Sequence, residues 1–166
     1  AEEIEITDDM MEAAKADTDT AIYVLGRNAG EGADRTDTKG DYELTDIEIA
    51  NLQKITENFD KVVVVINAGG AVDTKFVSEI EGIDSVLVMG QAGQRGGDAL
   101  VKVLNGEVTP SGKLAATWPV NYSDVADAEY WGANDGDIDQ EDYKDGIYVG
   151  YRYFDTFNVT DRKSVV

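Results

Sequence analysis

Histidine and cysteine are both absent from this 166-residue chain. Ser-His-Asp and Cys-His catalysis, thiolate metal sites and disulfide bonds are therefore excluded within it. Any acid–base chemistry must come from Asp, Glu, Lys or Tyr. The absence of cysteine is typical of a reducing compartment, which slightly favours a bacterial cytoplasmic location over secretion.

Basic residues are few, and long hydrophobic runs are missing. The chain has 14 Lys and Arg against 34 Asp and Glu, which gives a formal net charge of −20. A nucleic-acid-binding protein needs a basic face to displace counterions, so no nucleic-acid partner is expected. No apolar run approaches the length of a membrane span, so no membrane partner is expected either.

Short apolar runs alternate with helical patterns along the chain. This alternation predicts an α/β fold with a doubly wound, mostly parallel sheet sandwiched by helices. The expected strands are residues 21–25, 61–66 and 85–89. The expected helices are residues 7–16, a segment that carries Ile49, Leu52, Ile55 and Phe59, and residues 76–80 and 96–104. Thr45 and Glu48 form a capping-box signature at the start of the second helix.

The C-terminal third changes in character. Residues 119–146 are polar and Asp-rich, which indicates an insertion or linker, and residues 147–154 have a strand-like composition. Asn134 to Asp139 superficially resembles a calcium loop, but Gln140 stands where that loop requires glycine, so no metal site is expected. Residues 161–166 match what a common sequencing adapter encodes in one reading frame, so we expect an artefactual tail after a domain of residues 1–160.

In a parallel sheet, ligands gather beyond the carboxyl ends of the strands. Three loops are expected at that edge, formed by residues 26–44, 67–70 and 90–97. The first loop has glycines at 26, 30 and 32, a spacing similar to that of short-chain dehydrogenases. An NAD-binding site also requires a helix directly after the strand, whereas residues 33–41 are polar, and the expected Tyr-x-x-x-Lys pair is absent. NAD binding is therefore the weaker interpretation.

The second interpretation of this loop is that Glu31 is a catalytic acid. It lies between Gly30 and Gly32, where the backbone can bend sharply and a substrate can approach closely. Glycoside hydrolysis requires one carboxyl group that is protonated when the substrate binds, and burial or a neighbouring carboxylate raises its pKa. A purely structural alternative is that Glu31 forms an ion pair with Arg27 or Arg35.

Four segments together resemble the second domain of glycoside hydrolase family 3 β-glucosidases, over most of residues 20–158. They are GRNAGEGADR…TKGDYELT, KVVVVINAGGAVD, VLVMGQAGQRGGDALVKVLNGEVTPSGKLAATWP and YKDGIYVGYRYFDTF. The resemblance implies a partial (α/β)6 sandwich domain of a retaining, exo-acting β-glycosidase that hydrolyses terminal β-linked sugars. It implies that Glu31 is the general acid/base and that a barrel domain of the same polypeptide supplies the nucleophilic Asp. The carboxyl groups of Glu31 and of this nucleophilic Asp would lie about 5–5.5 Å apart.

The resemblance also implies the partners and the lesser residues of the site. The substrate would be a small oligosaccharide or β-glucoside, no metal or organic cofactor is required, and the chain alone would be inactive. Plant members of the family have their acid/base Glu where this chain has Asp37, which makes Asp37 the second choice. We expect Asp34 and Arg35 to hold the loop by a local ion pair, and Asp41 to set the turn after Gly40. Arg27 could orient Glu31 or only pack the base of the loop, and the structural role is the favoured one. A non-catalytic sugar-binding or interaction domain is the remaining alternative.

Overall fold

The computed structural model describes residues 3–28, 35–126, 128 and 144–161. The chain divides into two compact units, Ala1–Ser111 and Gly112–Val166. No helix in the described part of the chain is both long enough and apolar enough to cross a membrane.

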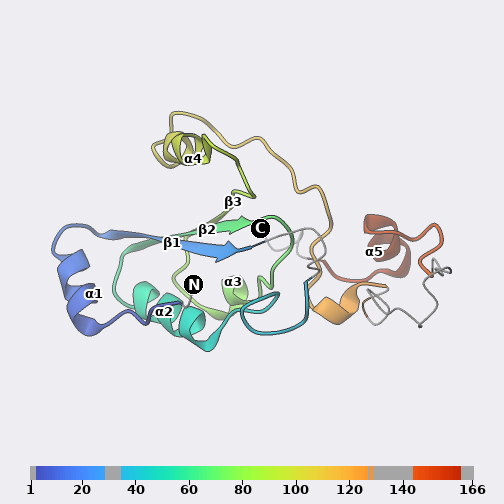
Figure 1. The fold of residues 1–166 in the computed structure, drawn as a ribbon, viewed down its shortest axis with the longest axis horizontal. Coiled ribbons are helices and arrows are strands. Elements are labelled where there is room, and N and C mark those ends of the chain that lie inside the picture. The colour runs from blue at the N-terminus through green and yellow to red at the C-terminus, as the bar shows by residue number, and fades with distance from the viewer. Residues whose placement is uncertain (1–2, 29–34, 127, 129–143, 162–166) are drawn as a thin grey trace. The chain divides into compact units, whose positions relative to one another are not determined.

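The first unit is built around a three-stranded parallel sheet (Figure 1). Its strands are β1 (Thr20–Arg27), β2 (Lys61–Ala68) and β3 (Ser85–Val88), in the order β1-β2-β3. Leu25 pairs with Ile66, and Ile66 pairs with Val88 on the other side. The predicted α/β fold with parallel strands is confirmed.

One helix precedes these strands, two connect them and one follows the last, and each starts within a residue of its predicted position. They are α1 (Asp8–Lys15), α2 (Asp46–Thr56), α3 (Phe76–Glu79) and α4 (Gly96–Leu104). Figure 1 shows α2 and α3 on one side of the sheet and α4 on the other. The capping box of Thr45 and Glu48 is confirmed. The prediction that Phe59 belongs to α2 is wrong, because the helix ends at Thr56 and the chain turns toward β2.

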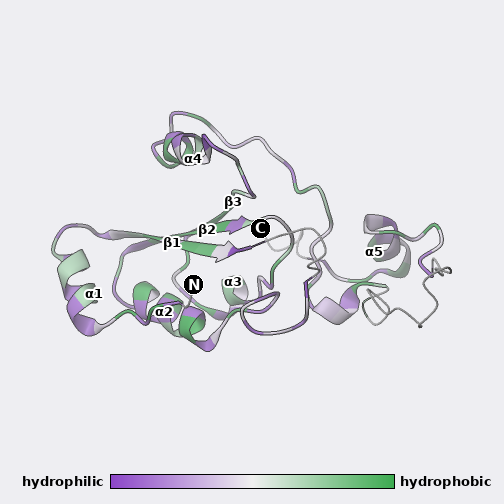
Figure 2. Cartoon of the chain, in the orientation of Figure 1, coloured by the Kyte–Doolittle hydropathy of each residue, from purple (hydrophilic) through white to green (hydrophobic). Residues whose placement is uncertain are grey.

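The hydrophobic core lies between the sheet and α2. Val62, Val64, Val65 and Ile66 of β2 are fully buried, as expected for a central parallel strand covered on both faces. Leu52 of α2 packs into the same core and is also fully buried. Figure 2 shows hydrophobic residues along β1 and β2 and also on α2 and α3.

The edge strand β1 has two different faces. Tyr23, Leu25 and Arg27 are buried on one face, whereas Ile22 and Val24 on the other are about half exposed, at 50% and 52%. The buried face of β1 therefore ends in an arginine. This places a guanidinium group at the carboxyl edge of the sheet and inside the protein.

The segment before α1 is attached to α2 by polar side chains. Asn51 accepts a hydrogen bond from the backbone N–H of Ile6 (2.9 Å) and donates one to the carbonyl of Ile4 (2.9 Å). The Tyr23 hydroxyl donates to Glu3 at 2.7 Å. Burial raises the pKa of Tyr23, and the hydrogen bond to Glu3 adds to the shift. These contacts stabilise the extended N-terminal segment against the core.

The second unit contains the 3₁₀-helix η1 (Tyr122–Asp124), the helix α5 (Tyr151–Phe157) and an isolated antiparallel bridge between Pro119 and Asp161. The strand-like interpretation of residues 147–154 is wrong, because residues 147–150 form turns and irregular structure and α5 begins at Tyr151. The aromatic residues recur at helical spacing: Tyr153 contacts Phe157 at 5.1 Å between ring centroids, and Phe154 is buried. Gly150, with φ of 59°, turns the chain into the helix. Most of the polar segment 119–146, and residues 162–166, lie outside the described residues.

Candidate functional site: the loop between β1 and α2

The carboxyl ends of the three parallel strands lie at one edge of the sheet. β1 ends at Arg27, β2 at Ala68 and β3 at Val88, so the loops that follow them meet at this edge. Glu31 and Asp34, two of the predicted site residues, lie outside the described residues. The other four, Arg27, Arg35, Asp37 and Asp41, are described.

Arg27 joins the two ends of the loop between β1 and α2. Its guanidinium group donates five hydrogen bonds, and an arginine has five N–H donors. Three go to backbone carbonyls: Gly26 at the start of the loop (2.9 Å), and Asp41 (2.9 Å) and Glu43 (3.1 Å) near its end. The other two go to the carboxylate of Glu48 on α2. The donors of Arg27 are all used inside the protein.

Glu48 is the acidic partner of Arg27, and the pair is buried. The two nitrogen–oxygen distances are 2.6 and 2.7 Å, and the side chains are 5% and 6% exposed. Glu48 also accepts a hydrogen bond from the backbone N–H of Thr45 at 2.8 Å, as the third residue of α2 in the capping box. The helix N-terminus favours a negative charge at this position. The carboxylate is thus fixed by both the strand and the helix.

Asp41 organises the outer part of the loop. Its Oδ1 accepts a hydrogen bond from Arg35 Nη1 (2.7 Å), and its Oδ2 accepts two from the backbone N–H (2.7 Å) and hydroxyl (2.9 Å) of Thr36. Partial burial acts to raise the pKa of Asp41, but these hydrogen bonds and the Arg35 charge outweigh it, so the pKa is lowered. Arg35 was expected to pair with Asp34; in the described part of the loop its ion-pair partner is Asp41.

Backbone hydrogen bonds complete the turn around Asp41. The carbonyl of Thr38 accepts from the N–H groups of Asp41 (3.2 Å) and Glu43 (3.1 Å), and Gly40 donates to the carbonyl of Glu43 at 2.9 Å. Gly40 has a φ of 86°, a conformation that glycine adopts readily and other residues rarely. Asp37 precedes this turn and is exposed.

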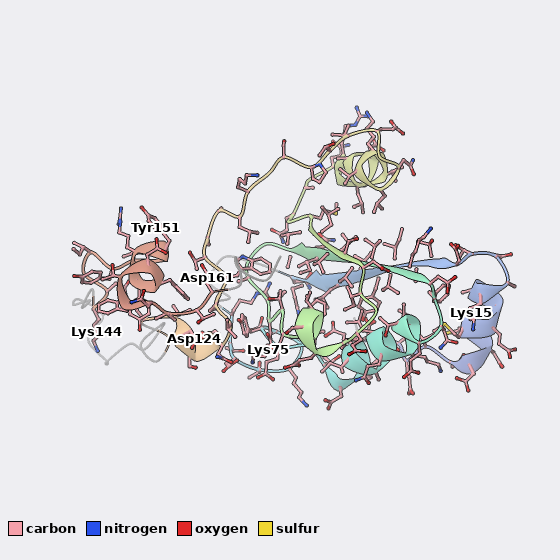
Figure 3. All side chains as sticks on the ribbon, turned by 180° about the vertical axis from the view of Figure 1, so that it is seen from behind. Lys15, Lys75, Asp124, Lys144, Tyr151 and Asp161 are labelled. Atoms are coloured by element: carbon pink, nitrogen blue, oxygen red, sulfur yellow. The ribbon has the colours of Figure 1, made fainter. Side chains whose placement is uncertain are left out.

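The loop is also attached to the one that follows β2. The backbone N–H of Asp73 donates to the carbonyl of the buried Tyr42 at 2.8 Å. Asp73 forms an ion pair with Lys75 at 3.5 Å, next to the start of α3 (Figure 3). The loop after β1 is therefore in direct contact with the segment after β2, at a residue beyond the predicted loop of residues 67–70.

This arrangement suits the presentation of a side chain better than the binding of a dinucleotide. Dinucleotide binding requires a helix directly after β1, whereas residues 35–45 form turns and α2 begins only at Asp46. Within the described ranges, no three acidic side chains come close enough together to hold a metal ion. What the described residues provide is a loop whose base is held on both sides by one buried ion pair.

Sequence reasoning missed Glu48 as a residue of this site. It identified Glu48 only as a helix cap, because the capping box is a pattern of neighbouring residues. The available signal was a charged residue, Arg27, at the end of an apolar strand where the alternation predicts burial. A buried arginine requires a carboxylate partner, and Glu48 is one of several acidic residues that follow.

Comparison with known proteins identifies the family. The model of the "Glycosyl hydrolase family 3 C-terminal domain" matches residues 3–151. A β-glucosidase of Ruminococcus albus is 41% identical over 156 residues, which cover 94% of this chain and 16% of that protein. β-Glucosidase A of Butyrivibrio fibrisolvens is 37% identical and matches 91% of this chain and 20% of its own length.

Solved structures agree with this assignment. β-Glucosidase 3B of Thermotoga neapolitana, in complex with glucose, superposes with a TM-score of 0.83 at 36% identity, over 94% of this chain and 22% of that one. The chain thus spans about a fifth of the length of the relatives it matches. The chain has a parallel sheet with the candidate loop at its carboxyl edge, and the family model matches most of the chain. The chain therefore belongs to glycoside hydrolase family 3, as part of its C-terminal domain.

Proposed function

We propose that the chain is part of a retaining, exo-acting β-glucosidase that removes terminal, non-reducing β-linked sugars from small oligosaccharides or β-glucosides. The observation that carries this proposal is the match over 94% of the chain to a β-glucosidase and to a β-glucosidase structure in complex with glucose. Because the chain spans only about a fifth of those proteins, the complete activity belongs to a longer parent polypeptide.

In this proposal Glu31 is the general acid/base. It protonates the departing glycosidic oxygen in the first step and removes a proton from the attacking water in the second, which is the double displacement of retaining glycosidases. The nucleophile is a carboxylate of a barrel domain in the same parent, about 5–5.5 Å from Glu31. The reaction needs neither a metal ion nor an organic cofactor.

The described contacts give both arginines that could pair with Glu31 another carboxylate partner. Arg27, one of its two possible ion-pair partners, already donates to Glu48 and to three carbonyls, with every N–H group in use. Arg35, the other, pairs with Asp41. The loop therefore has carboxylate partners for both arginines without Glu31.

The test is a pair of variants in the parent enzyme, Glu31→Ala and Asp37→Ala. For Glu31→Ala we expect a loss of about 10²–10⁴-fold with alkyl glucosides, a much smaller loss with activated aryl glucosides, and partial rescue by azide. Asp37→Ala is the matched control from the same loop, and we expect it to retain activity on both substrates. If only Asp37→Ala shows the leaving-group dependence and azide rescue, the acid/base is Asp37. The 166-residue chain alone should show no turnover, since it lacks the nucleophile.

A further inference from the structure

The buried pair Arg27–Glu48 lies at the base of the loop that carries the proposed acid/base. Arg27 is the last residue of β1, four positions before Glu31 in the sequence. The guanidinium group of Arg27 joins the start of the loop to its end, because it donates to the carbonyls of Asp41 and Glu43 as well as to that of the neighbouring Gly26. Glu48, from the first turn of α2, holds the guanidinium group in place with two hydrogen bonds. One buried ion pair thus fixes both ends of the loop.

We propose that Glu48, acting through Arg27, is a positioning residue of the glycosidase reaction, and that the pair sets the place of Glu31 relative to the barrel nucleophile. This inference rests on the proposed function of Glu31. It assigns a role in the reaction to a residue on a helix, outside the loop.

The physical reason is the short tether between Arg27 and Glu31. A general acid contributes fully only when its proton lies within hydrogen-bonding reach of the leaving oxygen, and an error of about 1 Å can cost roughly 100-fold in rate. Arg27 anchors the backbone four residues before Glu31, so releasing this anchor removes a constraint on where the loop starts. If the guanidinium group turns away, the carbonyl of Asp41 loses its bond to Arg27, and that of Glu43 keeps only the N–H of Gly40. The contact that joins the two ends of the loop is then lost.

The geometry of the pair favours this role over that of a general stabilising contact. A bidentate pair between a planar guanidinium group and a carboxylate fixes orientation as well as distance. Glu48 is itself oriented by the backbone N–H of Thr45 at 2.8 Å, so the orientation derives from the helix. The outer ion pair of the same loop, Lys39–Asp46, connects exposed side chains. It is not a bidentate guanidinium–carboxylate pair, and no hydrogen bond from the helix backbone to its carboxylate is described.

The experiment compares Glu48→Gln and Arg27→Lys with the parent enzyme on two substrates. Glu48→Gln keeps the size of the side chain and removes its charge, and Arg27→Lys keeps the charge and removes the planar fork. For both variants we expect kcat/KM to fall roughly 10- to 100-fold with an alkyl β-glucoside. We expect a fall of less than about threefold with a dinitrophenyl β-glucoside, whose leaving group needs no proton, and KM within about twofold of the parent value.

A loss of folded enzyme would lower both rates by the same factor, so the ratio of the two substrates separates positioning from stability. Lys39→Met is the matched control, since it removes an ion pair from the same loop, and it should leave both rates unchanged. Amide hydrogen exchange in residues 35–45 gives an independent readout. It should become faster in Glu48→Gln and Arg27→Lys and remain unchanged in Lys39→Met.

The outcomes separate the two proposals. If Glu31→Ala shows leaving-group dependence and azide rescue, but both pair variants slow the two substrates equally, the positioning role is overturned and the proposed function stands. If Glu31→Ala shows neither effect, the proposed function fails, and the positioning role fails with it because there is no acid to position. Selective loss on the alkyl substrate together with faster exchange in the loop supports the positioning role.

Discussion

Two ion pairs connect the loop after β1 to the first turn of α2, and they differ in burial and not in length. Arg27–Glu48 and Lys39–Asp46 both have a nitrogen–oxygen distance of 2.6 Å. The side chains of the first pair are 5% and 6% exposed, and those of the second 56% and 79%. In the buried pair each charge depends on its partner, because water cannot replace it. In the exposed pair water and salt can replace either partner.

The comparison shows that a short distance alone does not identify the contact that holds a loop. The buried pair lies where the strand and the helix converge, and its arginine also binds three carbonyls. The exposed pair joins two side chains at the surface by one hydrogen bond. Four predictions test the contrast.

The largest effect is expected for Glu48→Ala. This change leaves the Arg27 charge buried without a partner and removes the capping contact to Thr45, so the free energy of unfolding should fall by about 3–5 kcal/mol. Urea unfolding followed by circular dichroism measures it. Asp46→Ala, two residues earlier in the same helix turn, is the matched control and should change the midpoint far less. Equal losses in the two variants would contradict the importance of burial.

A smaller effect is expected for Asp41→Asn in the outer part of the loop. The change weakens three hydrogen bonds to a partly exposed carboxylate, so it should cost about 2 kcal/mol in the free energy of unfolding. The pKa of Asp41 is lowered in the folded protein, so its contribution is fully present above the unfolded value of about 3.9 and is lost as pH falls through the folded pKa. Below about pH 4 the difference between wild type and Asp41→Asn should therefore shrink. A constant difference down to pH 2 would contradict this role of Asp41.

Gly40→Ala tests the turn itself and should cost about 1 kcal/mol, because alanine is disfavoured at a φ of 86°. The matched control is Gly26→Ala in β1, where an added Cβ meets no atom within 4 Å and φ is not positive. Thermal melting of the two variants should show a lower midpoint for Gly40→Ala only. A lower midpoint for both would point to a general intolerance of side chains near the loop.

The smallest effect is expected for Lys39→Met. Both side chains of its ion pair are mostly exposed, so the melting midpoint should not change measurably at physiological salt. The comparison is sharpened by repeating the melt in low and high salt. A clear, salt-dependent loss of stability would show that the outer pair matters more than its exposure indicates.

Much of the first unit is predictable because its signals are local. β2 is a run of β-branched residues, and the capping box at Thr45 needs only residues three positions apart. The aromatic segment at 147–154 was predicted wrongly, because short apolar runs fit a strand or a buried helix equally well. There the helical spacing of Tyr153 and Phe157 and the turn at Gly150 favour α5.

The candidate loop could be located from its glycines and from its place after a strand, and its resemblance to a family indicated Glu31. The partner of Arg27 could not be found in this way. Glu48 is 21 residues away, and its proximity depends on where α2 packs against the sheet. The sequence alone was sufficient to predict the strands, the helix starts and the family. Only the tertiary structure determines that Glu48, among many carboxylates, is the partner of Arg27. A buried guanidinium group pairs with the acid that folding brings next to it.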